Sequence, residues 1–431
     1  MKTVLIIGAD FVPSSLPPAT RIRFFASHLP EFGWRPIVLT TSPEYYEGKS
    51  DPENEHLLRD DLEIIRVSAF STRLTRKVGI GDIGMRSLLQ HWNAVKRICS
   101  TRKIDSILIP VPPSITMVLG RLAYRRFKIP YVIDYIDPWV TDSYDKVPKA
   151  ERPPKWALAN ALSRTVEPYA LKHVAHITGV SQGTTDSVIN RYQWLSNDRA
   201  TEIPYGAEAA DFDYLRSNPR RQSVFNNQDG YFHISHVGAC IPAMHETVRA
   251  LFQAISLGLR DTPELFSRIR LHFIGTSYAS NGNAPSDVRR LAREANIAEL
   301  VEEQPSRVTY LESLQLMLDS HALLLLGSNE KHYTASKAFP CILANRPLLA
   351  IFHQASSVIN IMRQTEAGEL VTYSDDDGPD RQVGNIKLAL ERLVGNEHPL
   401  TPRNMDALEQ YSTLAMSARL AACLNSITGI R

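Results

Sequence analysis

The stretch Leu323-Leu-Leu-Leu-Gly-Ser-Asn-Glu-Lys-His-Tyr-Thr-Ala-Ser-Lys-Ala-Phe-Pro-Cys-Ile-Leu-Ala-Asn-Arg-Pro-Leu-Leu-Ala-Ile-Phe352 decides the predicted fold. An apolar run reaches Gly327, a polar loop leads into a helical pattern, and a second apolar run follows. Short apolar runs separated by a helix are typical of parallel strands that are buried on both faces of a sheet. We therefore expect a strand at Ala322–Leu326, a helix at Ala335–Ala344 and a strand at Leu348–Ile351.

The same alternation of strands and helices runs through both halves of the chain and predicts two α/β domains with parallel sheets. The expected strands of the first half are Thr3–Gly8, Pro36–Thr40, Glu63–Val67, Ser106–Pro110, Tyr131–Asp134 and His176–Val180, and its helices are Thr20–Glu31, Met85–Thr101, Ser114–Phe127, Lys155–His173 and Ser181–Arg191. The further strands of the second half are Phe232–Val237, Arg270–Ile274 and Val308–Tyr310, and its further helices are Glu246–Leu259, Ala284–Ala295 and Leu311–Ser320.

The length of the chain also favours two domains, because 431 residues exceed one ordinary core. The polar stretch Asn218–Gly230 is the best candidate for a linker. We expect an N-terminal domain at 1–217, a C-terminal domain at 218–403 and a helix in 404–431 that returns to the first domain.

Composition excludes several classes of protein. The net charge of +2 is nearly balanced and favours no nucleic-acid partner. The four cysteines, Cys99, Cys240, Cys341 and Cys423, are isolated, which predicts buried thiols in a reducing compartment and no metal site. The first apolar run fits a strand better than a signal peptide, and no run approaches the roughly 18 apolar residues of a spanning helix. We therefore expect a cytoplasmic protein.

One part of the first half is strongly basic. Eight lysines and arginines lie between Arg73 and Lys103, with only Asp82 and Asp105 as nearby acids. Such a stretch could contact an anionic membrane surface, which would place the protein peripherally at the inner membrane face, although charge runs are usually solvated faces.

The loop that follows the first expected strand is rich in Gly and Pro. It contains Gly8, Ser14, Ser15, Arg21 and Arg23, and it enters a helix. Backbone amides and arginines at such a turn can receive an anion. Gly8 can equally be a packing requirement. The loop has no G-x-G-x-x-G pattern, so a dinucleotide cofactor is disfavoured.

Two carboxylates, Asp134 and Asp137, end the strand that begins near Tyr131. Since open α/β sheets bind ligands at the carboxyl ends of their strands, Asp137 is a candidate for positioning a hydroxyl group or stabilising positive charge. The alternative is that Asp137 caps the turn before Pro138.

Strand ends in the second half carry the other candidates. Gly238 follows a strand and would let a diphosphate approach the backbone, while His236 inside that strand reads as a core histidine. His245 and Arg249 begin the next helix. After Gly327 come Thr334, Ala335, Ser336 and Lys337, where hydroxyl groups, free amides and an ammonium group at one helix start predict a phosphate site.

In this order and spacing, the segments resemble glycosyltransferase family 4, whose members are retaining enzymes with the GT-B fold. Pro130 to Trp139 is similar to the family's P-x-x-x-D-x-R-D-x-W form. Ile203-Pro-Tyr-Gly206 resembles its I-P-N-G element, and Ser336 to Pro347 resembles its S-K-x-F-E-Y-L-A-x-G-R-P donor motif. The resemblance covers essentially the whole chain, and it implies an α/β protein of the GT-B type, with two Rossmann-like parallel-sheet domains facing a central cleft.

The chain also departs from the family pattern. The family's paired glutamates align with His332 and Pro340, so the carboxylate that would hold the donor ribose is absent. The Arg and Lys expected after the second-domain glycine align with Ala239 and Met244, and Ile136 replaces a basic residue. The positive charge that binds the phosphates must then come from Lys337, helped by His245, Arg249 or Arg307. We expect the ribose contacts to come from Glu330 or Glu312.

The resemblance implies transfer of a hexose from a nucleotide-diphosphate sugar, UDP-glucose being the type expected, without cofactor or metal, to a saccharide or polyprenyl-linked acceptor in polysaccharide biosynthesis. The catalytic candidates are Asp137 and Lys337. The donor-binding candidates are Gly238, Arg249, Arg307, Tyr310, His332, Thr334, Ala335, Ser336 and Lys337. The acceptor-side candidates are Gly8, Ser14, Ser15, Arg21 and Arg23. The alternatives are a catalytically weak GT-B-like scaffold of a polysaccharide assembly complex and a sugar-phosphate epimerase that uses His236 or His332.

Overall fold

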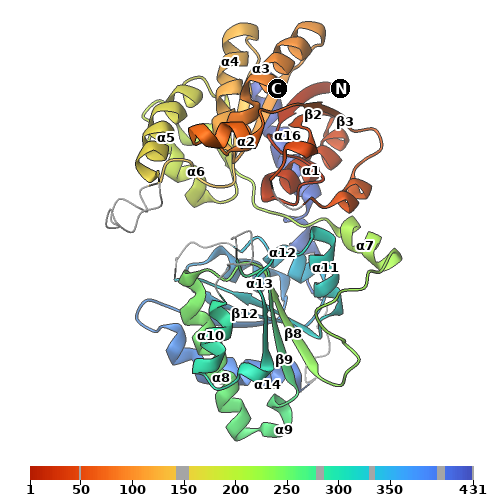
Figure 1. Ribbon diagram of the computed structural model, residues 1–431, viewed down its shortest axis with the longest axis vertical. Helices are drawn as coiled ribbons and strands as arrows, with labels where there is room; N and C mark the ends of the chain where they lie inside the picture. The colour runs from red at the N-terminus through yellow and green to blue at the C-terminus, as the bar shows by residue number, and fades with distance from the viewer. Residues whose placement is uncertain (48–49, 142–154, 278–285, 330–334, 396–402, 430–431) are drawn as a thin grey trace. The chain divides into compact units, whose positions relative to one another are not determined.

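The computed structural model describes residues 1–47, 50–141, 155–277, 286–329, 335–395 and 403–429 (Figure 1). The chain forms two compact units. Unit 1 comprises Met1–Tyr205 together with Thr413–Arg431, and unit 2 comprises Gly206–Ser412. No helix in the described ranges is both long enough and apolar enough to cross a membrane.

In the described part of unit 1, seven parallel strands form one sheet in the order β3-β2-β1-β4-β5-β6-β7. The strands are β1 (Lys2–Ile7), β2 (Trp34–Thr41), β3 (Glu63–Val67), β4 (Ser106–Val111), β5 (Tyr131–Tyr135), β6 (His176–Gly179) and β7 (Ala200–Glu202). The helices are α1 (Pro17–His28), α2 (Thr72–Thr75), α3 (Ile83–Thr101), α4 (Met117–Phe127), α5 (Trp156–Leu171), α6 (Gln182–Ile189) and α16 (Thr413–Ile427).

The apolar run of β1 explains why both faces of this sheet are covered. Leu5 and Ile7 join a core cluster with residues of α3 and α4, while Val4 and Ile6 join a second cluster on the opposite face. Alternate residues of a strand point to opposite faces, so an uninterrupted apolar run requires helices on both sides. The second cluster contains Leu420 of α16, and α16 packs beside α1, as Figure 1 shows in blue and red.

Within the described ranges of unit 2, six parallel strands form a sheet in the order β10-β9-β8-β11-β12-β13. The strands are β8 (Phe232–Val237), β9 (Ile269–Ile274), β10 (Val301–Gln304), β11 (Ala322–Leu326), β12 (Leu348–His353) and β13 (Glu369–Tyr373). The helices are α7 (Ala209–Ser217), α8 (His245–Asp261), α9 (Pro263–Phe266), α10 (Asp287–Glu294), α11 (Tyr310–Asp319), α12 (Ala338–Leu343), α13 (Ser357–Thr365), α14 (Val383–Val394) and α15 (Met405–Glu409).

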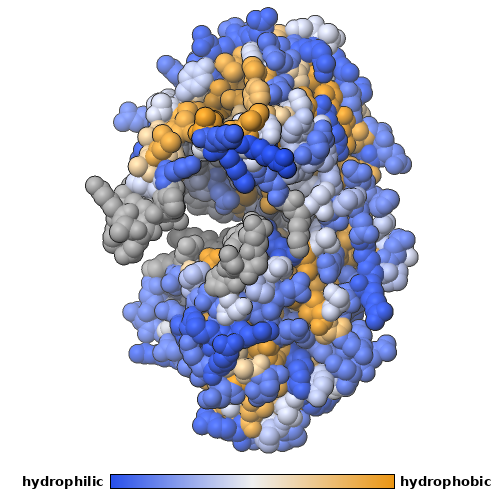
Figure 2. Space-filling model, in the orientation of Figure 1, coloured by the Kyte–Doolittle hydropathy of each residue, from blue (hydrophilic) through white to orange (hydrophobic). Residues whose placement is uncertain are grey.

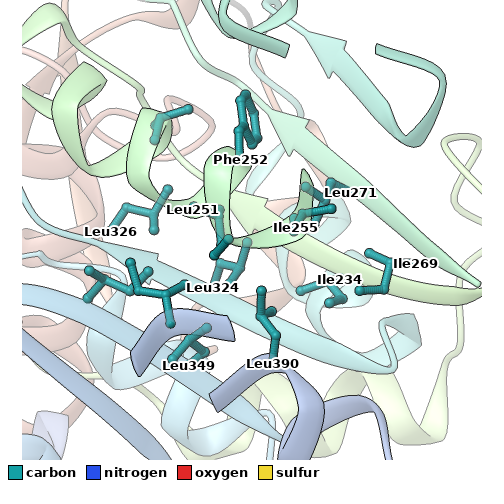
Figure 3. Packing of buried hydrophobic residues seen from close by; sticks show 14 of the residues in the cluster. Ile234, Leu251, Phe252, Ile255, Ile269, Leu271, Leu324, Leu326, Leu349 and Leu390 are labelled. Atoms are coloured by element: carbon teal, nitrogen blue, oxygen red, sulfur yellow. The ribbon is translucent and has the colours of Figure 1, made fainter. Parts of the chain in front are cut away.

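Two long helices cover one face of this second sheet. Leu251 and Ile255 of α8 and Leu390 of α14 pack against Ile234 and Leu324 of the strands, and all five side chains are almost completely buried (Figure 3). Apolar residues spaced three and four apart fall on one side of a helix, so the pattern of α8 produces this contact.

The strand predicted at Val308–Tyr310 is wrong. The strand at this edge is β10, Val301–Gln304, and Thr309 instead caps α11 by accepting a hydrogen bond from the amide of Glu312. β10 lies at the sheet edge, where Glu302 is exposed to water and Glu303 is buried. An edge strand needs only partial burial, so it can contain charged residues. The two glutamates of β10 therefore interrupt the apolar run by which a strand is predicted from the sequence.

The division of the chain falls at Gly206, before the polar stretch that sequence patterns single out as the linker. α7 belongs to unit 2 because it packs against α11, where the Tyr310 hydroxyl group donates to the Asp211 carboxylate at 2.6 Å.

Candidate functional site

Three glycines follow neighbouring strands of unit 2. Gly238 follows β8, Gly275 follows β9 and Gly327 follows β11. Gly275 has φ of 75°, which favours glycine, and a side chain on Gly327 would approach the Ile351 carbonyl oxygen to 3.0 Å. The carboxyl ends of these strands therefore form an edge that is free of bulky side chains, which suits a ligand in an open α/β sheet.

The amides of these glycines are already used by the sheet. The N–H groups of Gly238, Gly275 and Gly327 donate to Ile274, Gln304 and Ile351 at 2.9, 2.8 and 2.8 Å. The prediction that Gly238 brings the backbone close to a diphosphate thus needs charge from side chains, because its own amide is occupied.

Lys337 supplies a positive charge at this edge. Its Cγ lies 3.8 Å from the position that a Cβ on Gly238 would take. Loss of hydration lowers the pKa of the Lys337 ammonium group, and the nearby Arg307 guanidinium lowers this pKa further, while Cys341 opposes the change.

Arg307 comes to the same edge from the loop after β10. Its Cα lies 3.6 Å from the position of a Cβ on Gly275, and it also contacts other groups of the protein. Two neighbouring cations repel each other, and an anion that binds between or beside them offsets this repulsion. Gly238, Gly275, Gly327, Arg307 and Lys337 are here called the cationic edge.

The start of α12 differs from the expectation. The helix begins at Ala338, and Lys337 occupies its N-cap position without a side-chain capping bond. Ala335 is buried and Ser336 is exposed in the turn just before it. His332, Thr334 and the ribose candidate Glu330 lie outside the described residues.

Two other predicted donor residues engage different partners. The Tyr310 hydroxyl group donates to Asp211, so it serves the contact between α11 and α7. Arg249 of α8 is half exposed and lies 3.9 Å from Glu294 of α10. The role of Arg249 in phosphate binding stays a prediction.

His236 and His245 differ in how their ring nitrogens are engaged. His236 is buried, and its Nδ1 and Nε2 lie 3.2 and 3.5 Å from the carbonyl oxygens of Leu324 and Ala239. Burial lowers the pKa of His236 and keeps it neutral. His245 faces Asp287 of α10 at 3.9 Å.

In unit 1, Arg21 and Asp134 form a buried ion pair. Nε and Nη2 of Arg21 donate to the two carboxylate oxygens of Asp134 at 2.6 and 2.9 Å, and Thr178 donates to the same carboxylate at 2.7 Å. Arg21 also donates to the carbonyl oxygens of Ile203 and Pro204. The expectation that Arg21 offers its charge to an acceptor is corrected, because this guanidinium ties α1, β5 and the end of unit 1 together.

The rest of the loop after β1 is largely packed. A Cβ on Gly8 would stand 2.3 Å from Cδ1 of Ile22, so Gly8 is needed for the contact between β1 and α1. Arg23 is buried with its guanidinium over the Phe24 ring at 4.7 Å. Ser15 is partly exposed.

Asp137 lies in a bend just after β5 and is exposed. Neighbouring protein atoms partly desolvate its carboxyl group and raise the pKa of Asp137 above its usual range. The segment is held in place by Arg191, which donates to the Val140 carbonyl oxygen at 2.8 Å and pairs with the buried Glu167 at 3.2 Å. Asp137 therefore combines access to solvent with a fixed backbone.

Sequence reasoning missed Asp10 as a candidate. This carboxyl group is buried in the loop after β1, where Ser14 donates to it at 2.9 Å, and burial raises the pKa of Asp10 to about 6. A carboxylate that titrates near neutral pH at a strand end is a recognised mark of functional sites. Its position directly after an apolar strand was the available signal.

No three His, Cys, Asp or Glu side chains within the described ranges come together in a way that could hold a metal ion.

Residues 18–206 match the family described as Glycosyl transferase 4-like domain. A comparison with curated proteins found no significant match.

Among solved structures, the chain is similar to HepE of Anabaena in complex with UDP and glucose, with a TM-score of 0.63 and 12% identity over 99% of this chain and 100% of that chain. It is similar to sucrose-phosphate synthase of Thermosynechococcus elongatus, with a TM-score of 0.62 and 13% identity over 100% of both chains. A UDP-forming trehalose-phosphate synthase of Burkholderia xenovorans gives a TM-score of 0.61 and 12% identity over 99% of both chains. At these identities the likeness shows the fold, in which two parallel α/β sheets are joined in one chain.

Proposed function

We propose that this chain, which has the GT-B fold and matches a glycosyl transferase 4-like domain over residues 18–206, is a glycosyltransferase that moves a hexose from a UDP-sugar to a saccharide or lipid-linked acceptor with retention at the anomeric carbon. The proposed donor is of the UDP-glucose type, as in the complex of HepE with UDP-glucose. The proposed setting is polysaccharide biosynthesis in the cytoplasm.

The observation that carries this proposal is the cationic edge of unit 2. In the transfer, the bond between the sugar C1 and the β-phosphate oxygen breaks, the acceptor oxygen bonds to C1, and the acceptor's hydroxyl proton passes to the departing phosphate. Negative charge grows on the departing diphosphate, and fixed cations stabilise that charge more than they stabilise the intact donor. We assign this role to Lys337 and Arg307, because both flank the glycine turns.

Unit 1 would supply the acceptor side. Asp137 is accessible and its pKa is raised, so we assign it to a hydrogen bond with an acceptor or donor hydroxyl group. Asp10 and Ser14 form a second polar group at the end of β1. A carboxylate accepts hydrogen bonds from sugar hydroxyl groups, and its protonated form can also donate one.

One observation favours the alternative of a GT-B-like scaffold with little activity. The two glutamates of the family pattern are replaced by His332 and Pro340, and Pro340 lies within α12. Without these carboxylates the donor ribose must be held by other groups, for which Glu330 and Glu312 remain candidates.

A panel of nucleotide diphosphates and their sugars separates the two functions. We expect UDP and one UDP-hexose to raise the thermal midpoint in proportion to ligand excess over the dissociation constant, and we expect slow release of UDP from that hexose donor. Proton NMR of the product would then show the donor's anomeric configuration. Stabilisation by UDP without any release of UDP, even with acceptor extracts, would favour the scaffold.

A further inference from the structure

Unit 1 exposes a row of large apolar side chains on one short segment. Phe70, Leu74 and Val78 follow one another at intervals of four residues, and they are 50%, 66% and 75% exposed. Leu74 lies in α2, Val78 ends the 3₁₀ turn Arg76–Val78, and Phe70 precedes α2 by two residues. Single exposed apolar residues are ordinary, but three within nine residues of one segment are a mark of an interaction surface.

The same segment is basic. Arg73, Arg76 and Lys77 are exposed beside the apolar row, and no acidic residue occurs between Ser68 and Gly81. Arg76 pairs with Glu47 of the neighbouring loop at 3.0 Å, so one of the three charges is partly offset.

A second segment adds to this surface. Lys155 is exposed, and its Nζ lies 3.0 Å from the position of a Cβ on Gly79, which brings the start of α5 beside the 3₁₀ turn. The first seven residues of α5, Trp156-Ala-Leu-Ala-Asn-Ala-Leu162, carry no charge, and Leu158 is 72% exposed. Figure 2 shows hydrophobic residues gathered next to a strongly hydrophilic band over the part of unit 1 where α2 and α5 lie.

We propose that this surface, formed by Phe70, Arg73, Leu74, Lys77, Val78, Lys155 and Leu158, docks unit 1 on an anionic lipid bilayer. Apolar side chains would enter the boundary between headgroups and acyl chains, while the lysines and arginines meet anionic headgroups. We choose an anionic lipid because of charge complementarity. The exposed apolar side chains of this surface suit the acyl chains, and the lysines and arginines around them suit the negatively charged headgroups above those chains. The inference is independent of the donor site, which is built entirely in unit 2.

The test is co-sedimentation of the full-length protein with vesicles of phosphatidylcholine alone and with vesicles that contain about one-third phosphatidylglycerol. We expect binding to the anionic vesicles only. The charge variant Arg73→Glu with Lys77→Glu should bind about thirtyfold more weakly, and the apolar variant Leu74→Ser with Val78→Ser about tenfold more weakly.

Matched controls lie on exposed positions of unit 2. Arg289→Glu with Arg293→Glu on α10 repeats the change in charge, and Leu388→Ser on α14 repeats the loss of an exposed apolar side chain. Both controls should bind like the wild type, and all variants should keep the thermal shift with UDP. Loss of that shift in every protein, including the wild type, would count against the proposed donor and not against this surface.

Three results would overturn the inference. They are equal binding to both kinds of vesicle, anionic binding that the apolar variant leaves unchanged, and a concentration-dependent dimer that only the apolar variant abolishes. The last result would assign the surface to a second copy of the chain.

Discussion

At the residue scale, the positive charge of the donor site rests on few side chains. The sequence singles out Lys337, Arg307 and Gly238, and the structure brings these three to one edge. The sequence could not show that Arg21 forms an ion pair with Asp134. The two residues lie 113 positions apart, and only the folded sheet brings them together.

The buried Asp10 carboxyl group leads to a prediction about pH. Its pKa is raised from 3.8 to about 6, so ionising this group in the folded protein costs about 3 kcal/mol more free energy than in the unfolded chain. Because the folded state favours the protonated form, this group's contribution to stability is complete below about pH 4 and is lost as pH rises through about 6. We expect Asp10→Asn to remove that loss.

The measurement compares the free energy of unfolding in urea for wild type and Asp10→Asn between about pH 4 and pH 7. The difference should shift in favour of the variant by up to about 3 kcal/mol as pH rises. Taking the difference cancels the groups that titrate in both proteins. A constant difference would show that Asp10 is not held in a desolvated position.

At the scale of elements, apolar periodicity located most strands and helices of both sheets within a few residues. It failed at β10, β7 and β13, which have exposed or polar positions, and it missed α13 and α14. β7 and β13 are edge strands, as β10 is, and edge strands need less apolar surface than central ones. The missed strands thus all lie at sheet edges, whereas α13 and α14 were missed although they contribute buried residues.

Two glycines in helices of unit 2 give a matched test of packing. A Cβ on Gly258 of α8 would stand 2.4 Å from the ring of Phe266, which is fully buried, whereas Gly384 of α14 has nothing within 4 Å. We expect Gly258→Ala to lower the free energy of unfolding by about 1–3 kcal/mol, because the ring cannot move away easily. Gly384→Ala should raise it by up to about 1 kcal/mol through helix propensity.

Urea unfolding followed by far-ultraviolet circular dichroism measures both effects. Stabilisation by Gly258→Ala would contradict the close contact between α8 and α9.

At the scale of the whole molecule, the two units can be observed separately. The chain has five tryptophans, Trp34, Trp92, Trp139, Trp156 and Trp194, and all of them belong to unit 1. Tryptophan emission therefore reports the unfolding of unit 1, while calorimetry reports both units. If the donor site lies in unit 2, UDP at about one hundred times its dissociation constant should stabilise that unit by about 2.7 kcal/mol.

We expect UDP to raise the midpoint temperature of the calorimetric transition of unit 2, which tryptophan emission does not report. The midpoint of the emission transition, which reports unit 1, should rise less. A shift confined to tryptophan emission would place the nucleotide in unit 1. The C-terminal helix α16 belongs to unit 1, because Leu420 and Leu424 pack in the core cluster that contains residues of β1.

The central claim is that Lys337 at the cationic edge holds the donor diphosphate, and calorimetric titration of UDP tests it most directly. We expect Lys337→Ala to keep the thermal midpoint of the wild type and to bind UDP at least about tenfold more weakly, which is the loss of about 1.4 kcal/mol. Arg293→Ala, which removes an exposed cation of the same unit, should bind UDP as the wild type does. Equal affinity for UDP in Lys337→Ala and the wild type would contradict the account.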